Sequence, residues 1–374
     1  MNTTLKNKKK FFILFILIFQ FFICQKIFSQ EAYYVVKGKV IDKNSKNPLQ
    51  GASVFAQNTT LGVASNADGN FVIKLPNGGY SLIVTYTGYE TESMRISNAS
   101  SQNDTLVFEL SPKEKALEEV SIAISYEVKD GWQKYGEFFT KNFIGQSNFA
   151  KQCVIKNPEA LHFYFYKKKN RLKVLAKEPL SVDNFALGYN LKFAIDSFTY
   201  DYNTNINLFI GYPLFEEMQG TPEQQQTWKQ NRSDVYKGSM LEFMRGLFNQ
   251  TLEEDGFELQ FIVKNNDEEM SIPLQNLYGA LNYSKDDSTN TVEFKPNQNE
   301  VALIYKNAEP EQLYLNTDST AKKDFQLSTL FFAPDESIII EQNGYYFDQT
   351  DITTNGYLAF KKIGDMLPYD YVPE

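Results

Sequence analysis

Side chains suited to nucleophilic or metal chemistry are scarce in this 374-residue sequence, which contains one histidine and two cysteines. His162 is the sole imidazole, and Cys153 is the sole cysteine beyond the first thirty residues. A cysteine nucleophile needs a base that takes its proton, and a spacing of about nine residues does not by itself bring the two together. We therefore interpret His162 as a strand residue and Cys153 as a small hydrophobic residue, with a Cys–His pair left as the alternative.

Carboxylates are the second source of chemistry, because a glycoside hydrolase needs only two of them at a set separation. Neighbouring acidic residues occur at Glu216-Glu217, Glu253-Glu254-Asp255, Asp267-Glu268-Glu269 and Asp286-Asp287. Acidic pairs beside Asn, Gly and Lys are typical of solvated loops, and the sequence does not place any two across a cleft. A carboxylate-dependent glycan hydrolase is therefore an alternative hypothesis.

An apolar, loop-like segment at 209–215 is the candidate for binding. Phe209, Tyr212 and Phe215 would form a binding loop that stacks on a sugar ring or covers a peptide. An ordinary buried crossing of the chain is the other interpretation. The sequence has no phosphate-binding loop, dinucleotide fingerprint or HExxH motif. We predict no catalytic residue, no cofactor and no metal site.

The first 29 residues predict a signal peptide. Lysines precede an apolar run at 11–24, which is short for a membrane span, and Ser29 offers a small residue for cleavage. The chain is therefore expected in the periplasm or at the outer membrane or cell surface, with no membrane span after cleavage. An uncleaved anchor is the alternative.

The charge of the mature chain limits its partners. Five of the 37 basic residues and none of the 46 acidic residues lie in the leader, which leaves 32 basic residues and a net charge of −14. Such a surface repels nucleic acid and anionic lipid, so neither is an expected partner. An envelope protein or a glycan is expected instead.

Short β-rich runs separated by turn residues fill residues 33–111. The expected strands are 34–41, 52–56, 61–65, 70–75, 80–86, 90–96 and 104–110. Seven short strands at this spacing favour a β-sandwich. Asp68-Gly69 is interpreted as a hairpin turn, because the acidic ladder of a calcium loop is missing.

This segment resembles the carboxypeptidase-regulatory-like domain family. The resemblance rests on Gly38-Lys39-Val40-Ile41-Asp42, Pro48-Leu49-Gln50-Gly51-Ala52-Ser53-Val54, Asn66-Ala67-Asp68-Gly69-Asn70-Phe71, Tyr80-Ser81-Leu82 and Gly88-Tyr89. It implies a transthyretin-like sandwich, common in envelope proteins of Bacteroidota and generally non-catalytic. A zinc carboxypeptidase needs two His ligands, so one histidine argues against that activity.

Residues 112–130 predict a linker, and 131–374 predict a β-rich α+β domain with a few helices. A hairpin is expected from 161–166 and 172–176, with further strands at 257–264, 291–294, 302–305 and 312–315. Another hairpin is expected around 342–344. One helix is expected to begin after Thr221 and a second near Ser233-Asp234, which Gly256 would end. About 240 residues are too few for a plugged outer-membrane barrel.

Patches of the second part resemble the region behind this front domain in Bacteroidota proteins described only as carboxypeptidase-like regulatory domain-containing. Examples are Leu187-Gly188-Tyr189, Gly211-Tyr212-Pro213 and Asp365-Met366-Leu367-Pro368-Tyr369. That resemblance implies no activity. The sequence therefore predicts a mainly β, secreted, non-catalytic envelope protein that binds a partner protein or glycan, with the sandwich as spacer or docking module.

Overall fold

The computed structural model describes residues 33–97, 105–113, 126–265, 268–334, 336–346, 348 and 350–373, and it is mainly β. The predicted signal peptide and residues 114–125 of the predicted linker lie outside the described residues. Within the described residues, no helix combines the length and apolar character that a membrane span requires.

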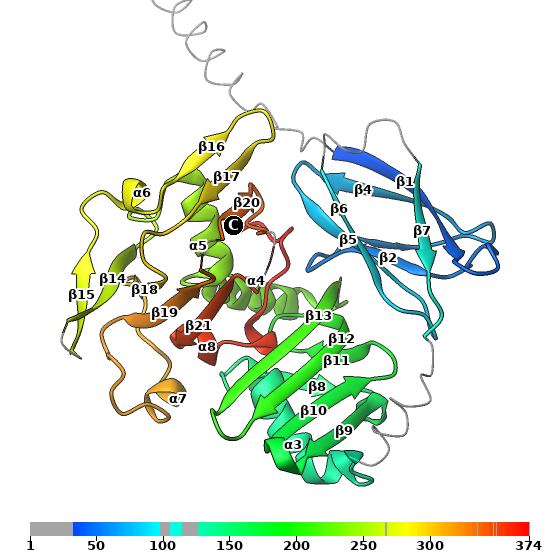
Figure 1. Ribbon diagram of the computed structural model, residues 1–374, viewed down its shortest axis with the longest axis horizontal. Helices are drawn as coiled ribbons and strands as arrows, with labels where there is room; N and C mark the ends of the chain where they lie inside the picture. Colours follow the sequence, from blue (N-terminus) through cyan, green and yellow to red (C-terminus); the bar gives the residue numbers. More distant parts are fainter. Residues whose placement is uncertain are drawn as a thin grey trace, which may run out of the picture. The chain divides into compact units, whose positions relative to one another are not determined.

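All seven predicted strands of the front module form, and they make two sheets around one core (Figure 1). One sheet has the order β4-β1-β7 and the other β3-β2-β5-β6. The strands are β1 (Tyr33–Asp42), β2 (Ser53–Ala56), β3 (Gly62–Ala64), β4 (Asn70–Pro76), β5 (Tyr80–Thr85), β6 (Glu92–Ile96) and β7 (Leu106–Leu110). β4 illustrates the alternation, since Phe71, Ile73 and Leu75 are buried and their neighbours are not. The predicted β-sandwich is confirmed.

The turn at Asp68-Gly69 is confirmed as a turn, but it is not a hairpin. Gly69 has φ +77, and the side chain of Asn66 accepts hydrogen bonds from the backbone N–H groups of Asp68 and Asn70. The turn joins β3 to β4, which belong to different sheets.

A six-stranded sheet begins the second part, with helix α3 (Gly131–Phe143) on one face. Its order is β8-β11-β12-β10-β9, and β13 pairs with the other side of β12. The strands are β8 (Cys153–Ile155), β9 (Leu161–Tyr166), β10 (Arg171–Ala176), β11 (Leu180–Asn184), β12 (Tyr189–Asp201) and β13 (Ile206–Glu217). Phe139 and Phe143 of α3 pack on β12, where the rings of Phe139 and Phe198 lie 5.1 Å apart. The predicted β9–β10 hairpin is confirmed.

Two further sheets, of five and three strands, complete the described chain (Figure 1). The first comprises β15 (Glu268–Pro273), β14 (Phe257–Asn265), β18 (Glu300–Tyr305), β19 (Gln326–Phe332) and β21 (Ile352–Gly356). The second comprises β16 (Ser284–Asp286), β17 (Thr291–Phe294) and β20 (Ile338–Glu341). The helices are α4 (Pro222–Tyr236), α5 (Met240–Asn249), α6 (Leu277–Ala280), α7 (Gln312–Leu315) and α8 (Tyr357–Phe360), with 3-10 turns at Ala150–Gln152, Pro158–Ala160, Lys167–Lys169 and Ile363–Asp365.

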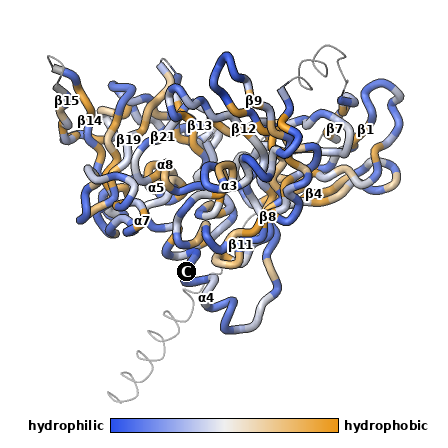
Figure 2. Tube along the Cα trace, turned by 90° about the horizontal axis from the view of Figure 1, so that it is seen from below, coloured by the Kyte–Doolittle hydropathy of each residue, from blue (hydrophilic) through white to orange (hydrophobic). Residues whose placement is uncertain are grey.

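The second part contains two hydrophobic cores. One gathers around α3 and the six-stranded sheet, and the other around α5 and the two smaller sheets. Hydrophobic residues lie mainly along the strands, and hydrophilic residues fill most connections (Figure 2). In the same part of the chain, Lys361 pairs with Glu311 and with Asp365 at 3.2 Å, and the Ser147 hydroxyl donates to Asp365 at 2.7 Å.

Two of the predicted helix boundaries are wrong: the start of the second helix and its end. The capping box of Thr221 and Gln224 is confirmed, but α4 runs on through Ser233 to Tyr236. Gly238, with φ +72, separates the two helices, and the Ser239 side chain caps the N-terminus of α5. α5 ends at Asn249, with Gln250 in the left-handed conformation as its C-cap, whereas Gly256 leads into β14.

The predicted strand at 312–315 is also wrong, because these residues form helix α7. The ring of Tyr314 packs against Tyr357 at 5.2 Å and Phe360 at 5.5 Å, so tertiary contacts override the local pattern. The predicted strands within β14, β17 and β18 are confirmed. The hairpin expected around 342–344 is reduced to one bridge between Ile340 and Tyr346.

Asp42 gives a pH-dependent prediction for the sandwich. The backbone N–H of Ser45 at 2.6 Å and the Tyr89 hydroxyl at 2.7 Å favour its charged form and lower its pKa from 3.8 to about 2. The stability gained is therefore present above about pH 4 and disappears as the pH falls toward 2. Urea unfolding should show Asp42→Asn less stable than wild type at pH 7, with the difference shrinking between pH 4 and pH 2.

Asp68→Asn is the matched control, because no hydrogen bond from a described residue reaches the Asp68 carboxylate. A wild-type minus Asp42→Asn difference that stays constant down to pH 2 would contradict the assignment.

Candidate functional site

The segment 209–215 lies within strand β13, so the predicted loop conformation is wrong. Phe215 is fully buried, and Phe209 packs against Phe143 with ring centroids 5.2 Å apart. Tyr212 points to the opposite face, beside Phe55 and Leu214, and burial raises its pKa. The structure therefore does not bring the three predicted residues together in one site.

The glycine and proline of this strand fit an edge position. A Cβ on Gly211 would lie 2.3 Å from the Phe193 ring, so only glycine allows this approach. Pro213 lacks an N–H, but its carbonyl points away from β12 and accepts the N–H of Asn58 at 2.8 Å. Proline is tolerated where the missing N–H faces away from the sheet.

A buried turn at 58–60, between β2 and β3, joins the sandwich to β13 and to the end of the chain. The Phe215 N–H donates to the Thr59 carbonyl at 2.9 Å, and the Tyr369 N–H donates to the Asn58 carbonyl at 2.7 Å. Thr59 is 0% exposed. The hydroxyl and N–H of Thr60 both donate to the Asp370 carboxylate, the N–H at 3.0 Å. This 58–60 turn is therefore held by hydrogen bonds on both sides.

A second set of contacts joins the sandwich to β20 and the residues after it. The Arg95 guanidinium pairs with Glu341, whose side chain is 4% exposed. The Ser81 and Tyr345 hydroxyls lie 2.7 Å apart. Burial raises the pKa of Glu341, and Arg95 opposes that shift. A buried carboxylate of this kind requires its cation, so the two sides depend on each other.

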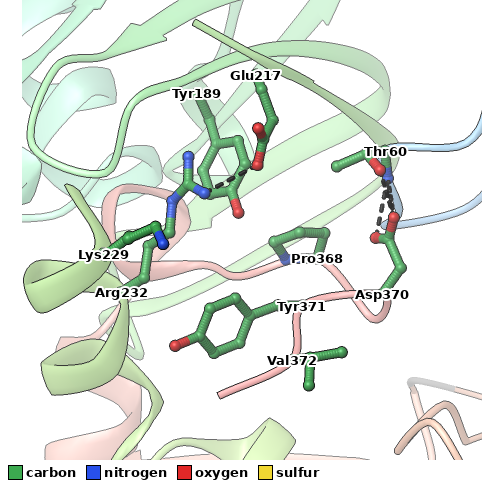
Figure 3. A pocket seen from close by; sticks show the side chains of 9 residues that line it. All are labelled: Thr60, Tyr189, Glu217, Lys229, Arg232, Pro368, Asp370, Tyr371 and Val372. Carbon is green, nitrogen blue, oxygen red and sulfur yellow. Dashed lines mark hydrogen bonds and ion pairs between the residues drawn. The ribbon is translucent and has the colours of Figure 1, made fainter. Parts of the chain in front are cut away.

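A pocket of about 300 Å³ adjoins the 58–60 turn (Figure 3). It is lined by Thr60, Tyr189, Glu217, Lys229, Arg232, Pro368, Asp370, Tyr371 and Val372. Aromatic rings, both signs of charge and a hydroxyl therefore share one concavity. Such a lining suits a small polar group.

Arg232 is engaged by the protein itself. Its guanidinium lies 3.8 Å from the Tyr189 ring centroid, and Nη1 donates to Glu217 at 2.9 Å. Nε and Nη2 donate to the carbonyls of Leu187 and Gly188. Trp228 and Asn231 donate to the preceding carbonyls of the same turn, at 185 and 186. Helix α4 thus fixes the β11–β12 connection, and Trp228 is buried at 7% exposure.

The two carboxylates of the pocket point to different partners (Figure 3). Glu217 is directed at Arg232, and Asp370 is directed at Thr60. Burial raises the pKa of Asp370, and the hydrogen bonds from Thr60 oppose that shift. Two carboxylates in one concavity are what a glycoside hydrolase requires. Here, however, each carboxylate already has a structural partner.

The remaining chemical candidates lie apart from the pocket. Cys153 lies on β8 and His162 on β9, at opposite ends of the sheet order. Burial raises the pKa of Cys153 to about 12, which keeps the thiol neutral. His162 Nδ1 lies 2.7 Å from Glu127. Among the described residues, no three His, Cys, Asp or Glu side chains are grouped as a metal site would require.

Sequence reasoning missed most of the residues that line the pocket. Asp370 and Thr60 are separated by 310 positions, and no local motif connects them. Glu217 alone was among the acidic candidates. The available signal was the pair of family-like patches around Tyr189 and Pro368, whose residues line the same pocket.

Thr60→Val should destabilise the protein by about 1–2 kcal/mol in urea unfolding, because the half-buried Asp370 carboxylate loses the hydroxyl that donates to it. Thr60→Ser retains a hydroxyl and should lie close to wild type. Equal stability of the two variants would show that the hydroxyl contributes nothing.

Comparisons with known proteins assign the front of the chain. Residues 36–122 match the CarboxypepD_reg-like domain family, and no curated protein matches the chain. Among solved structures, a DUF3823 family protein from Bacteroides ovatus ATCC 8483 is 12% identical, covering 50% of this chain and 83% of that one, with a TM-score of 0.17. A 9R-lipoxygenase from Cyanothece PCC8801 is 9% identical, covering 60% and 50%, with a TM-score of 0.15. Neither TM-score supports an argument, whereas the family match does: the chain carries a carboxypeptidase-regulatory-like domain at residues 36–122.

Proposed function

We propose that this is an exported, non-catalytic binding protein whose second part holds a partner protein, with the sandwich as a docking module. The predicted leader and the carboxypeptidase-regulatory-like domain support export. The hydrogen bonds of the 58–60 turn favour a docked module over a loose spacer.

The observation that carries this proposal is an exposed apolar row on β13. Ile206, Leu208 and Ile210 are 63%, 51% and 40% exposed. They alternate along one strand and therefore share one face. Three large aliphatic side chains in succession on an open face are typical of a binding surface rather than of scattered exposure.

The same row continues under the sandwich. Tyr212 and Leu214 follow at the same spacing, and Phe55 and Ile83 of the sandwich pack against them. Leu214 is 8% exposed as a result. The protein thus covers one end of the row with its own front domain, and the other end presents the same chemistry to a partner.

Replacing Ile206, Leu208 and Ile210 together by Thr should abolish partner capture without unfolding the protein. Threonine has the β-branched shape that strands favour, and it removes apolar area. Cross-linking in intact cells with a tag after Glu374, followed by identification of co-purified proteins, measures the effect. Wild type is expected to recover one envelope protein in near-equal amount.

The matched control is Val72→Thr with Val107→Thr, since these sandwich residues are 55% and 49% exposed. The control should retain the partner. Recovery of the same protein by the β13 triple variant would exclude the apolar row as the binding surface.

A glycan hydrolase is the second candidate, and the two carboxylates of the pocket are the observation in its favour. Under that hypothesis, Glu217→Gln and Asp370→Asn would each abolish release of reducing sugar from envelope glycans. Under our proposal, wild type releases none, so sugar release that both variants lose would overturn the non-catalytic assignment.

A further inference from the structure

The outer edge of β13 has two halves that differ in their hydrogen bonding. In an antiparallel strand, the N–H and C=O of one residue point to the same side, and successive residues alternate. The Pro213 carbonyl and the Phe215 N–H both bond the 58–60 turn, away from β12. The odd-numbered residues of β13 therefore present their backbone groups to the outer edge.

By this alternation, Asn207, Phe209 and Gly211 also present an N–H and a C=O to the outer edge. The register of β13 against β12 places its single irregularity on β12, so the alternation along β13 is unbroken. Within the described part of the chain, no backbone hydrogen bond to another segment uses these groups. All three residues are partly exposed to solvent.

We propose that the 207–211 edge of β13 binds an extended segment of the partner protein by strand addition. The inference rests on the proposed function and specifies its mode. Backbone hydrogen bonds to Asn207, Phe209 and Gly211 would supply alignment. Apolar side chains at alternate positions of the segment would cover Ile206, Leu208 and Ile210.

Two observations select an extended segment as the occupant. The apolar row is one strand wide, because the facing residues of β12 are Asp201, Thr199 and Ser197. A globular partner or a second copy would need a broader apolar area than this row for a stable interface. The same edge already accepts backbone pairing, since Thr59 of the 58–60 turn forms an isolated parallel bridge with Leu214.

The experiment uses the whole mature protein and a set of fluorescent eight-residue peptides with Val or Ile at alternate positions and Ser, Thr or Glu between them. Peptides of the same composition with the apolar residues in one block are the control. Binding should increase protection from hydrogen exchange at the amides of Asn207, Phe209 and Gly211. Those of Ile206, Leu208 and Ile210 already face β12 and should not change.

Backbone donors are then removed from each partner in turn. Asn207→Pro removes an outward N–H at an edge position that accepts proline, and Asn207→Ala measures the loss of the side-chain bond to Asn142. Asn207→Pro should bind about 2- to 10-fold more weakly than Asn207→Ala, the effect of one net hydrogen bond. Peptides N-methylated at alternate residues test the same bonds with the protein unchanged, and they should lose binding.

Peptide binding without new protection at 207, 209 and 211 would overturn strand addition and leave the apolar row as a surface for side-chain contact. Absence of binding by every alternating peptide would also overturn it. The cross-linking experiment with the Ile206, Leu208 and Ile210 threonine variant tests the proposed function separately. A dimer that Asn207→Pro dissociates would make a second copy the occupant and overturn the assignment to a partner segment.

Discussion

The buried 58–60 turn joins the sandwich to β13 and to the end of the chain, and the rest of this arrangement depends on it. Loops normally stay at the surface because their backbone groups need partners. This turn is buried because β13 and the chain end supply them: Asn58 bonds Pro213 and Tyr369, and the Thr59 carbonyl accepts from Phe215. Asn58 has φ +55, a conformation that asparagine tolerates better than most residues. The 58–60 turn, β13 and the chain end therefore stabilise one another.

The 58–60 turn covers only one part of β13, so the strand has a covered half and an uncovered half. From Pro213 onward, the edge and the outer face are covered by the sandwich. Up to Gly211, the edge groups and the apolar row have no partner among the described residues, although the strand is continuous. An exposed edge with apolar side chains is a liability that proteins usually blunt with charge, proline or a cover. This acidic chain has an exposed apolar edge at 206–211 without charge or proline to protect it, and this supports the proposed role of the edge in binding.

The sequence predicted the fold correctly where a local alternation of buried and exposed residues sets the secondary structure. The prediction was wrong where packing against distant residues sets it. The seven sandwich strands were found because each buries every second residue, as in β4. Helix α7 was missed because Tyr314 gains its contacts from Tyr357 and Phe360, more than forty positions later. The break between α4 and α5 did have a local signal in Gly238-Ser239. It was missed because the apolar spacing through Tyr236 and Met240 continues across the break.

The apolar row and open edge of β13 could not be predicted from the sequence for a different reason. Gly211 and Pro213 made 209–215 look like a loop, yet both residues suit an edge strand, one by its close approach to Phe193 and one by its outward-facing nitrogen. Whether a strand is central or at an edge depends on its neighbours in space, which the local sequence does not reveal. Of the aromatic residues that drew attention, Phe215 is buried, and Phe209 and Tyr212 are partly buried. The proposed binding surface is formed by Ile206, Leu208 and Ile210, which lie before and between these aromatic residues. Each is an ordinary strand residue, and together they form a surface only because this part of β13 has no second neighbouring strand in the described chain.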